Sequence, residues 1–224
     1  MSKGRPLRIG LTGGYACGKS SATAIFIQLG VPCIDADQVA REIVAPHTPA
    51  LTALIKLFGT TIITSDGELQ REKLRQIVFN NPLQRQQLEA VTHPYIRQAI
   101  QHWVKQQQGP YLIIAAPLLL EAGWQNEVDH ILLIDLPEAE QLTRAMVREQ
   151  RTAEEIQQVI NSQFPRWQRC AAANTIIDNS GDLATLEKSI NAFHQHLQQS
   201  LYPNYLEMQV GGKVANPHGQ SYSK

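Results

Sequence analysis

Short, continuous apolar segments alternate along the chain with longer segments whose apolar residues recur every three or four positions. Five of the short segments have the length of buried strands: Leu7–Thr12, Val31–Ala36, Tyr111–Ala116, His130–Asp135 and Thr175–Asp178. Helical spacing is found from Ser20 to Leu29, where Gly30 follows as a stop signal, and from Leu183 to Leu201. Strands that alternate with helices predict right-handed βαβ units. The expected fold is therefore α/β, with a parallel sheet covered by helices on both faces.

Two segments interrupt this alternation. Residues from about 38 to 109 are rich in glutamine and mainly helical in pattern, and we interpret them as a helical insertion beside the sheet. Within it, His93-Pro94 is interpreted as a helix break. A second, polar insert covers about 149–172. The predicted organisation is a single domain over 1–202, with its core in about 7–37, 110–148 and 173–202, and a flexible tail over 203–224.

Composition and charge restrict the function. The chain has 224 residues, of which 43% are hydrophobic and 18% charged, which excludes a disordered or coiled-coil protein. Twenty basic residues balance twenty acidic ones, so no field of the whole chain attracts nucleic acid or an anionic membrane. Three scattered cysteines predict neither a disulfide framework nor a metal site. The N-terminal residues lack the pattern of a signal peptide and no apolar run has the length of a membrane span, so we expect a cytoplasmic protein without nucleic-acid or membrane partners.

One motif carries clear chemistry. Residues 13–20, hereafter the phosphate loop, match G-x-x-x-x-G-K-[ST] in full and join the first predicted strand to the first helix. Glycines let the backbone approach phosphate closely, and the helix N-terminus adds its partial positive charge. Lys19 is predicted to reach the β- and γ-phosphates of ATP, and the Ser20 hydroxyl to ligate Mg²⁺. The full set of predicted phosphate-binding positions is Gly13, Gly14, Ala16, Cys17, Gly18, Lys19, Ser20 and Ser21.

The phosphate loop alone does not choose between kinases, GTPases and ATPases. The base-reading Asn-Lys-x-Asp of GTPases is not found in the sequence, and Asp178–Gly181, which fits a loose D-x-x-G pattern, is interpreted as a turn. An ATPase needs an acidic residue at the end of an apolar strand, for which Asp135 is a weak candidate. A small-molecule kinase fits the chain length better.

Two carboxylates, Asp35 and Asp37, stand at the end of the second predicted strand. Ligands of open α/β sheets bind beyond such strand ends, and residues two apart on a strand face the same way. The pair suits Mg²⁺ binding and acceptance of a proton from an attacking alcohol. Asp37 equally suits the capping of a helix over Gln38–Val44, and the sequence leaves both interpretations open.

Arginines and a cysteine supply further candidates. Arg144, Arg148 and Arg151 are spaced to share one face of the helix after Pro137, where they could offset phosphate charge. The pattern taken alone favours a solvated face instead. Cys17, within the phosphate loop, is predicted to be a reactive thiol whose alkylation blocks ATP binding.

In its motifs the chain resembles the dephospho-coenzyme A kinase family over about residues 8–200. The quoted matches are 9–14 with 18–20, Ile34–Asp37, Ala40-Arg41, Phe58-Gly59, Asp66-Gly67, His93-Pro94, Pro117–Leu119 with Glu121, Gln141 with Arg144, Gln163 with Arg166, and Ile177–Asn179. The resemblance implies ATP-dependent phosphorylation of the ribose 3′-hydroxyl of dephospho-CoA, the last step of coenzyme A synthesis. It also implies a P-loop kinase core, a substrate-binding role for 38–109 and a mobile lid over 149–172.

By the same resemblance, Asp37 is the general base and Arg144 the catalytic arginine, acting with Lys19. The substrate-binding positions it implies are Asp37, His93, Pro117, Leu118 and Glu121, and Asp35 is a second candidate for Mg²⁺ beside Ser20. Ala16 departs from a usual glycine, which restricts the backbone there, and Asn174 replaces a usual aspartate.

Neither departure removes the candidate catalytic residues, so we expect an active enzyme that uses ATP and Mg²⁺. We expect a monomer or a small homo-oligomer. Two other functions remain open at this point: a small-metabolite kinase of the shikimate or gluconate type, and a nucleotide-dependent switch without turnover.

Overall fold

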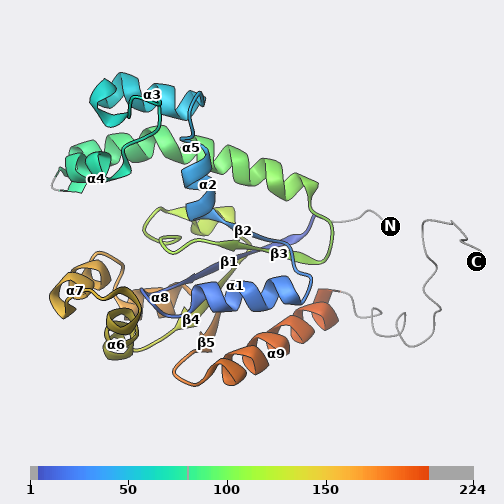
Figure 1. The fold of residues 1–224 in the computed structure, drawn as a ribbon. Coiled ribbons are helices and arrows are strands. Elements are labelled where there is room, and N and C mark those ends of the chain that lie inside the picture. Colours follow the sequence, from blue (N-terminus) through green and yellow to red (C-terminus); the bar gives the residue numbers. More distant parts are fainter. Residues whose placement is uncertain (1–4, 80, 202–224) are drawn as a thin grey trace, which may run out of the picture.

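The computed structural model describes residues 5–79 and 81–201, so the predicted tail at 203–224 lies outside the described residues. Its centre is a parallel sheet of five strands in the order β2-β3-β1-β4-β5 (Figure 1). The strands are β1 (Leu7–Gly13), β2 (Cys33–Asp35), β3 (Tyr111–Ala115), β4 (His130–Asp135) and β5 (Thr175–Asp178). The predicted α/β fold with a parallel sheet is therefore confirmed.

The second strand is shorter than predicted. Pro32 has no N–H to donate to the ladder, and Ala36 already begins a helix capped by Asp35. The predicted range of 31–36 thus loses residues at both ends. The carboxyl end of β2 is consequently the start of the next helix, which matters for the site described below.

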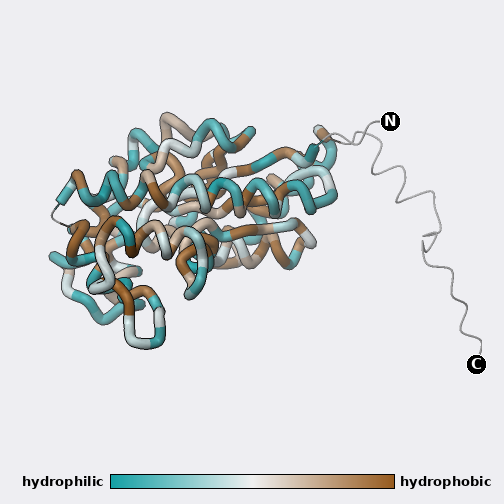
Figure 2. The backbone as a smooth tube through the Cα atoms, turned by 90° about the horizontal axis from the view of Figure 1, so that it is seen from above, coloured by the Kyte–Doolittle hydropathy of each residue, from teal (hydrophilic) through white to brown (hydrophobic). Residues whose placement is uncertain are grey.

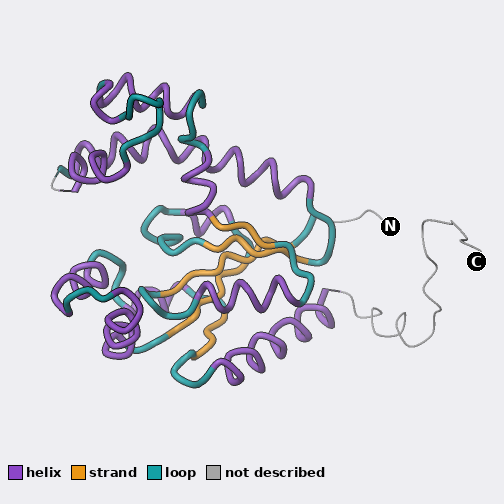
Figure 3. The backbone as a smooth tube through the Cα atoms, in the orientation of Figure 1, coloured by secondary structure: helices purple, strands orange, loops and turns teal. Residues whose placement is uncertain are grey.

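Helices cover both faces of the sheet (Figures 1 and 3). The helices α1 (Lys19–Gln28) and α9 (Leu183–Leu201) pack on one face, where Phe26 meets the rings of Tyr111 and Phe193 edge-on at 6.5 and 6.3 Å. The opposite face, which carries Leu112 and Ile114, packs against α2 (Ala36–Glu42) and α5 (Pro82–Gln106). Because both faces are covered, successive residues of the central strands are buried alike.

The insertion between β2 and β3 is a helical layer with a core of its own. It contains α2, α3 (Pro49–Phe58), the 3₁₀ turn η1 (Thr60–Ile62), α4 (Arg71–Phe79) and α5. Thr48 and Asn81 accept backbone N–H groups at the starts of α3 and α5, and each is followed by proline at the first helical position. Hydrophobic and hydrophilic residues alternate around these helices (Figure 2). The apolar ones gather around Leu54 and Ile62.

The predicted helix break at His93-Pro94 is wrong, because α5 continues through Pro94 over 25 residues. Proline removes one hydrogen bond from the helix interior, but apolar residues on both sides of it remain anchored. Val91 and Tyr95 pack in the cluster of the insertion, whereas Ile96 and Ile100 pack on the sheet. Tertiary packing therefore holds the helix through the proline.

Three further helices stand near the carboxyl ends of the strands: α6 (Glu138–Glu149), α7 (Ala153–Asn161) and α8 (Arg166–Ala172) (Figure 1). The turn η2 (Trp124–Glu127) lies between β3 and β4. Gln150 ends α6 in a left-handed conformation, with φ of 52°. The prediction that Arg151 shares a helix face with Arg144 and Arg148 is therefore wrong, since the chain changes direction before it. Among the described residues, no helix combines the length and apolarity needed to cross a membrane.

Candidate active site

The phosphate loop lies where predicted, between the end of β1 and the start of α1. Gly18 takes a left-handed φ of 94° as the residue before the helix, and Ala16 also lies in the left-handed region with φ of 52°. A side chain in that region costs about 1–2 kcal/mol, so the alanine makes this turn less favourable than a glycine would. The Lys19 Nζ donates to the carbonyl oxygens of Gly13 at 2.9 Å and Gly14 at 3.2 Å.

Two buried amide side chains from distant elements clamp this loop. Gln141 of α6 is fully buried, donates to the Leu136 carbonyl at 2.7 Å, and lies where a Cβ on Gly14 would project. Asn179, just after β5, donates to the Cys17 carbonyl at 2.8 Å and lies where a Cβ on Gly18 would project. Close approach of these two side chains therefore favours glycine at both positions. Neither amide was predicted to be functional, although both belong to the motifs that carry the family resemblance, Gln141 with Arg144 and Ile177–Asn179.

A cavity of about 590 Å³ opens in front of the phosphate loop. It brings together nine of the predicted site residues from four separate segments: Ala16, Cys17, Gly18, Lys19, Ser20, Ser21, Asp37, Pro117 and Arg144. A larger cavity, of about 810 Å³, lies between α5 and the amino ends of β1 and β3. None of the predicted site residues lines that second cavity. The smaller cavity is the candidate active site, because it contains the phosphate loop and the charged residues, although the other cavity is larger.

The two carboxylates after β2 have different environments. Asp35 Oδ1 accepts the backbone N–H of Asp37 at 2.8 Å and of Gln38 at 3.4 Å, so Asp35 is the cap of α2. The capping interpretation of Asp37 is therefore wrong. Asp37 instead lines the cavity. Although its side chain reaches solvent, packed protein around it raises the pKa of the Asp37 carboxyl, and repulsion by Asp35 adds to this rise, whereas Lys19 and Arg41 oppose it.

The arginines near the cavity are not equivalent. Arg144 lines it, donates to the Gly181 carbonyl at 3.4 Å and lies 4.0 Å from a carboxylate oxygen of Glu140. Arg166 instead forms three hydrogen bonds with Asp135 at the end of β4, at 3.0, 3.1 and 2.6 Å. Asp135 is thus neutralised by an ion pair that ties α8 to the sheet. Its pairing with Arg166 removes the case for Asp135 as the acidic residue of an ATPase.

Three of the predicted substrate residues lie outside the cavity lining. The His93 ring packs against Trp124 with 6.1 Å between ring centroids, and burial lowers its pKa. Leu118 is exposed in the turn after β3. The Glu121 carboxylate accepts the backbone N–H of Phe164 at 2.7 Å, which links that turn to the segment between α7 and α8. These residues are grouped with the connection around η2 and not with the phosphate loop.

Cys17 is fully buried, which contradicts the prediction of a reactive thiol. Its side chain packs in the cluster between α1, α9 and the sheet. At this position of the turn the side chain is directed into the core. A phosphate can therefore be bound here only by the backbone N–H, and the sulfur is inaccessible to alkylating reagents.

Comparison with known proteins identifies the same fold and function class. A family model described as dephospho-CoA kinase matches residues 7–185. A dephospho-CoA kinase of Hahella chejuensis is 45% identical over 192 residues, which cover 86% of this chain and 92% of the relative. The corresponding protein of Escherichia coli K12 is 38% identical over 191 residues, or 85% and 93% of the two chains.

Two solved structures are similar over most of their length. A protein from Thermus thermophilus has a TM-score of 0.78 at 29% identity, with coverage of 87% of this chain and 99% of the other. A dephospho-CoA kinase from Campylobacter jejuni has a TM-score of 0.66 at 26% identity, with coverage of 86% and 98%. The similarity therefore includes the sheet, the helical insertion and the helices around the phosphate loop.

Proposed function

The chain belongs to the dephospho-CoA kinase family, and on this premise we propose how its residues divide the reaction between them. The enzyme transfers the γ-phosphoryl group of ATP to the ribose 3′-hydroxyl of dephospho-CoA, which gives coenzyme A and ADP. The observation that carries the assignment of residues is the meeting of Lys19, Asp37 and Arg144 in one cavity. A shikimate- or gluconate-type kinase and a switch without turnover are not favoured, because the family match spans most of the chain.

On the nucleotide side, the backbone N–H groups of residues 13–21 bind the β- and γ-phosphates. Lys19 shifts from its two carbonyl acceptors to the phosphate oxygens, which carry full negative charge and are the stronger acceptors. Arg144 balances charge on the migrating phosphoryl group. Its contacts with Gly181 and Glu140 are long, at 3.4 and 4.0 Å, so little stabilisation is lost when it turns to the phosphate.

On the acceptor side, Asp37 accepts the proton of the attacking 3′-hydroxyl. The raised pKa of Asp37 makes it a stronger base than an ordinary carboxylate. Asp35 supports it in two ways, since it caps the helix that presents Asp37 and its charge contributes to that raised pKa. The two carboxylates therefore have separate roles, one in chemistry and one in positioning.

The residues present fit a magnesium ion that is shared with the nucleotide. No group of three metal-ligating side chains occurs among residues 5–79 and 81–201, which argues against a cage made of protein alone. Mg²⁺ commonly takes one or two protein oxygens and completes its shell with phosphates and water. The Ser20 hydroxyl lines the cavity and would supply one such oxygen, whereas Asp35, the second predicted ligand, caps α2 and is not among the residues that line the cavity. When bound, the ion neutralises charge on the β- and γ-phosphates.

The surrounding segments complete the assignment. We assign the acceptor side to the helical insertion, because α2 carries Asp37 directly into it. We assign the lid to α7 and α8 with their connections, because Gln163, between these two helices, lines the cavity together with the phosphate loop. Closure of this lid would exclude water from the phosphoryl group.

Release of ADP with a panel of acceptors tests the function. Purified enzyme is given ATP and Mg²⁺ with dephospho-CoA, shikimate, gluconate or no acceptor. We expect ADP release with dephospho-CoA only, and a product whose added phosphate is located on the ribose 3′ position by mass spectrometry and NMR. Equal release with shikimate or gluconate, or release that needs no acceptor, would contradict the assignment.

A further inference from the structure

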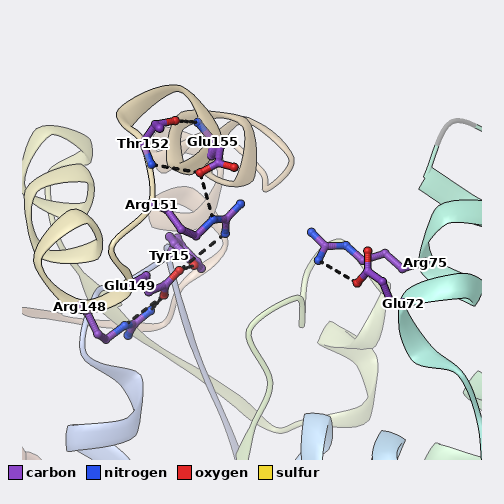
Figure 4. A network of polar contacts seen from close by, with 8 residues as sticks. All are labelled: Tyr15, Glu72, Arg75, Arg148, Glu149, Arg151, Thr152 and Glu155. Carbon is purple, nitrogen blue, oxygen red and sulfur yellow. Dashed lines mark hydrogen bonds and ion pairs between the residues drawn. The ribbon is translucent and has the colours of Figure 1, made fainter.

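Tyr15, at the tip of the phosphate loop, is joined to the end of α6 by a polar network (Figure 4). Its hydroxyl donates to the carboxylate of Glu149, the last residue of that helix. Glu149 in turn accepts from the guanidinium of Arg148 and lies 3.7 Å from that of Arg151. Arg148 also lies over the Tyr15 ring, at 5.7 Å from its centroid. A residue of the nucleotide site thus contacts both Arg148 and Glu149, the last two residues of α6.

The pairing of Arg148 with Glu149 needs an explanation. Consecutive residues of a helix point in different directions and do not normally face each other. Tyr15 brings the two side chains together. Its ring packs against the Arg148 guanidinium, and its hydroxyl donates to the Glu149 carboxylate. The hydrogen bond from Tyr15, followed by that from Arg148, lowers the pKa of Glu149, so the carboxylate stays charged.

Arg148 takes part in two sites. It is a member of this network, and it also lines the cavity in front of the phosphate loop, together with Tyr15 and Lys19. Its side chain is 58% exposed, so it is free to turn. A triphosphate in that cavity offers the same guanidinium several charged oxygens and therefore competes directly with Glu149.

The connection from α6 to α7, where the assigned lid begins, directly follows Glu149. Gln150, directly after Glu149, has the left-handed φ of 52°, and Thr152 then starts α7 with a capping box closed by Glu155. Apolar contacts accompany the polar ones, since Tyr15 and Ala16 pack against Ile156 and Ile160 of α7. A change in the contacts of Tyr15 would therefore also affect the packing of α7, the first helix of the lid.

From these contacts we propose that Tyr15 is a positioning residue that holds Glu149 against Arg148, and that this carboxylate competes with the nucleotide triphosphate for Arg148. The network limits affinity for ATP, and for ADP after transfer, by giving Arg148 an alternative partner. This inference rests on the proposed function only in taking the cavity as the nucleotide site. It extends that function with a control of nucleotide affinity.

Neutralising Glu149 tests the proposal. The dissociation constant of Mg·ATP is measured by calorimetry without acceptor for the wild type and for Glu149→Gln. We expect binding to become about threefold to fivefold tighter, the scale of one partly exposed ion pair. The Michaelis constant for dephospho-CoA should stay within about twofold of wild type. General damage to the fold would not tighten ATP binding while leaving this constant unchanged. Unchanged or weaker ATP binding would overturn the proposal.

Two further variants separate the network from general charge effects. Glu154→Gln removes the same charge from the first turn of α7, and Glu154 forms no ion pair within the described residues. It should change the constant by less than about twofold, and a gain equal to that of Glu149→Gln would overturn the proposal. Tyr15→Phe keeps the ring but loses the hydroxyl. It should tighten ATP binding by itself, and Glu149→Gln should then add less than about twofold.

If Glu149→Gln tightened ATP binding as much in the Tyr15→Phe enzyme as in the wild type, Tyr15 would not be the residue that positions Glu149. Should Glu149→Gln fail to fold, judged by its thermal midpoint, Tyr15→Phe alone decides the matter, because unchanged ATP binding in that variant would overturn the inference. All of these binding measurements omit the acceptor. A failure of the network and a failure of the acceptor assignment are therefore seen in different experiments.

Discussion

The two halves of the active site are assembled in different ways. On the nucleotide side, the phosphate loop lies against Gln141 and accepts a hydrogen bond from Asn179, two buried side chains from distant parts of the chain. On the acceptor side, Asp37 stands in the first turn of a helix of seven residues, and the contact that starts this helix comes from Asp35, two residues earlier. One half is stabilised by long-range contacts and the other by a local one.

This difference predicts that binding and chemistry can be disrupted separately. A change in the clamp of the phosphate loop should disturb folding and nucleotide binding together, because the same hydrogen bond serves both. A change at Asp37 should disturb the reaction alone, since Asp37 is not the residue that caps its helix. The four predictions below test this contrast.

The largest effect is expected for Asp37→Asn. Asparagine cannot accept the hydroxyl proton as a carboxylate does, and general-base catalysis contributes about 10²- to 10⁴-fold. We expect turnover of dephospho-CoA to fall at least about 100-fold, with ATP binding retained and a thermal midpoint within a few degrees of wild type. Steady-state kinetics, calorimetry and thermal unfolding measure the three quantities. A variant that keeps more than about a tenth of wild-type turnover would exclude Asp37 as the base.

On the nucleotide side, Asn179→Ala should act on stability and binding at once. It leaves the buried carbonyl of Cys17 without its donor, which costs about 1–3 kcal/mol of unfolding free energy. We expect a lower thermal midpoint and weaker ATP binding, seen in urea unfolding and calorimetry. Asn191→Ala in α9 is a control, because the side chain of Asn191 donates its hydrogen bond within its own helix, to the Glu187 carbonyl. Loss of stability without weaker ATP binding would separate the clamp from the nucleotide.

A smaller effect is expected at Asp35, where two substitutions divide its roles. Asp35→Ala removes the cap of α2 and should cost about 1 kcal/mol of unfolding free energy, whereas Asp35→Asn should cost little, because asparagine caps equally well. Both remove a negative charge beside Asp37, so the pKa of Asp37 should fall. The acid limb of the pH profile of kcat/KM should therefore move to lower pH in both variants. A profile identical to that of wild type would show that Asp35 does not influence the base.

The smallest effect is expected for the labelling of Cys17, which should be slow in the folded enzyme. Its sulfur is fully buried beneath the phosphate loop, so iodoacetamide should modify it slowly even without ATP. Labelling in urea, followed by mass spectrometry of the peptides, provides the accessible reference for all three cysteines. Rapid labelling of Cys17 that ATP prevents would restore the reactive thiol of the sequence analysis.

Much of the fold could be predicted from the sequence, since buried parallel strands leave continuous apolar runs. The bounds of His130–Asp135 and Thr175–Asp178 agree with the structure residue for residue. The errors came from local chemistry that tertiary contacts override or that the pattern leaves ambiguous. Proline predicted a break in α5, but apolar contacts on both sides hold the helix. Either aspartate suited the cap of α2, and only the start of the helix at Ala36 decides for Asp35.

The candidate site could be predicted only in part, for a similar physical reason. The phosphate loop is a local motif, so its eight positions can be recognised from spacing alone. The contacts that shape it are not local. Nothing in the spacing around Gln141 or Asn179 places either amide beside a glycine of the loop, because the topology of the sheet brings them there. The direction of the Cys17 side chain likewise depends on the turn and not on the motif.

The hydrogen bond between Asn179 and Cys17 also indicates when the phosphate loop can reach its final conformation during synthesis. It joins residues 162 positions apart, so the phosphate loop obtains its clamp only after β5 has been made and has paired with β4. Long-range parallel pairing forms late in folding, and nascent chains emerge with their N-terminal part first. The motif that binds ATP is thus among the first segments to leave the ribosome and among the last to reach its working shape. We therefore expect ATP to stabilise nearly complete chains and to leave shorter nascent chains unaffected.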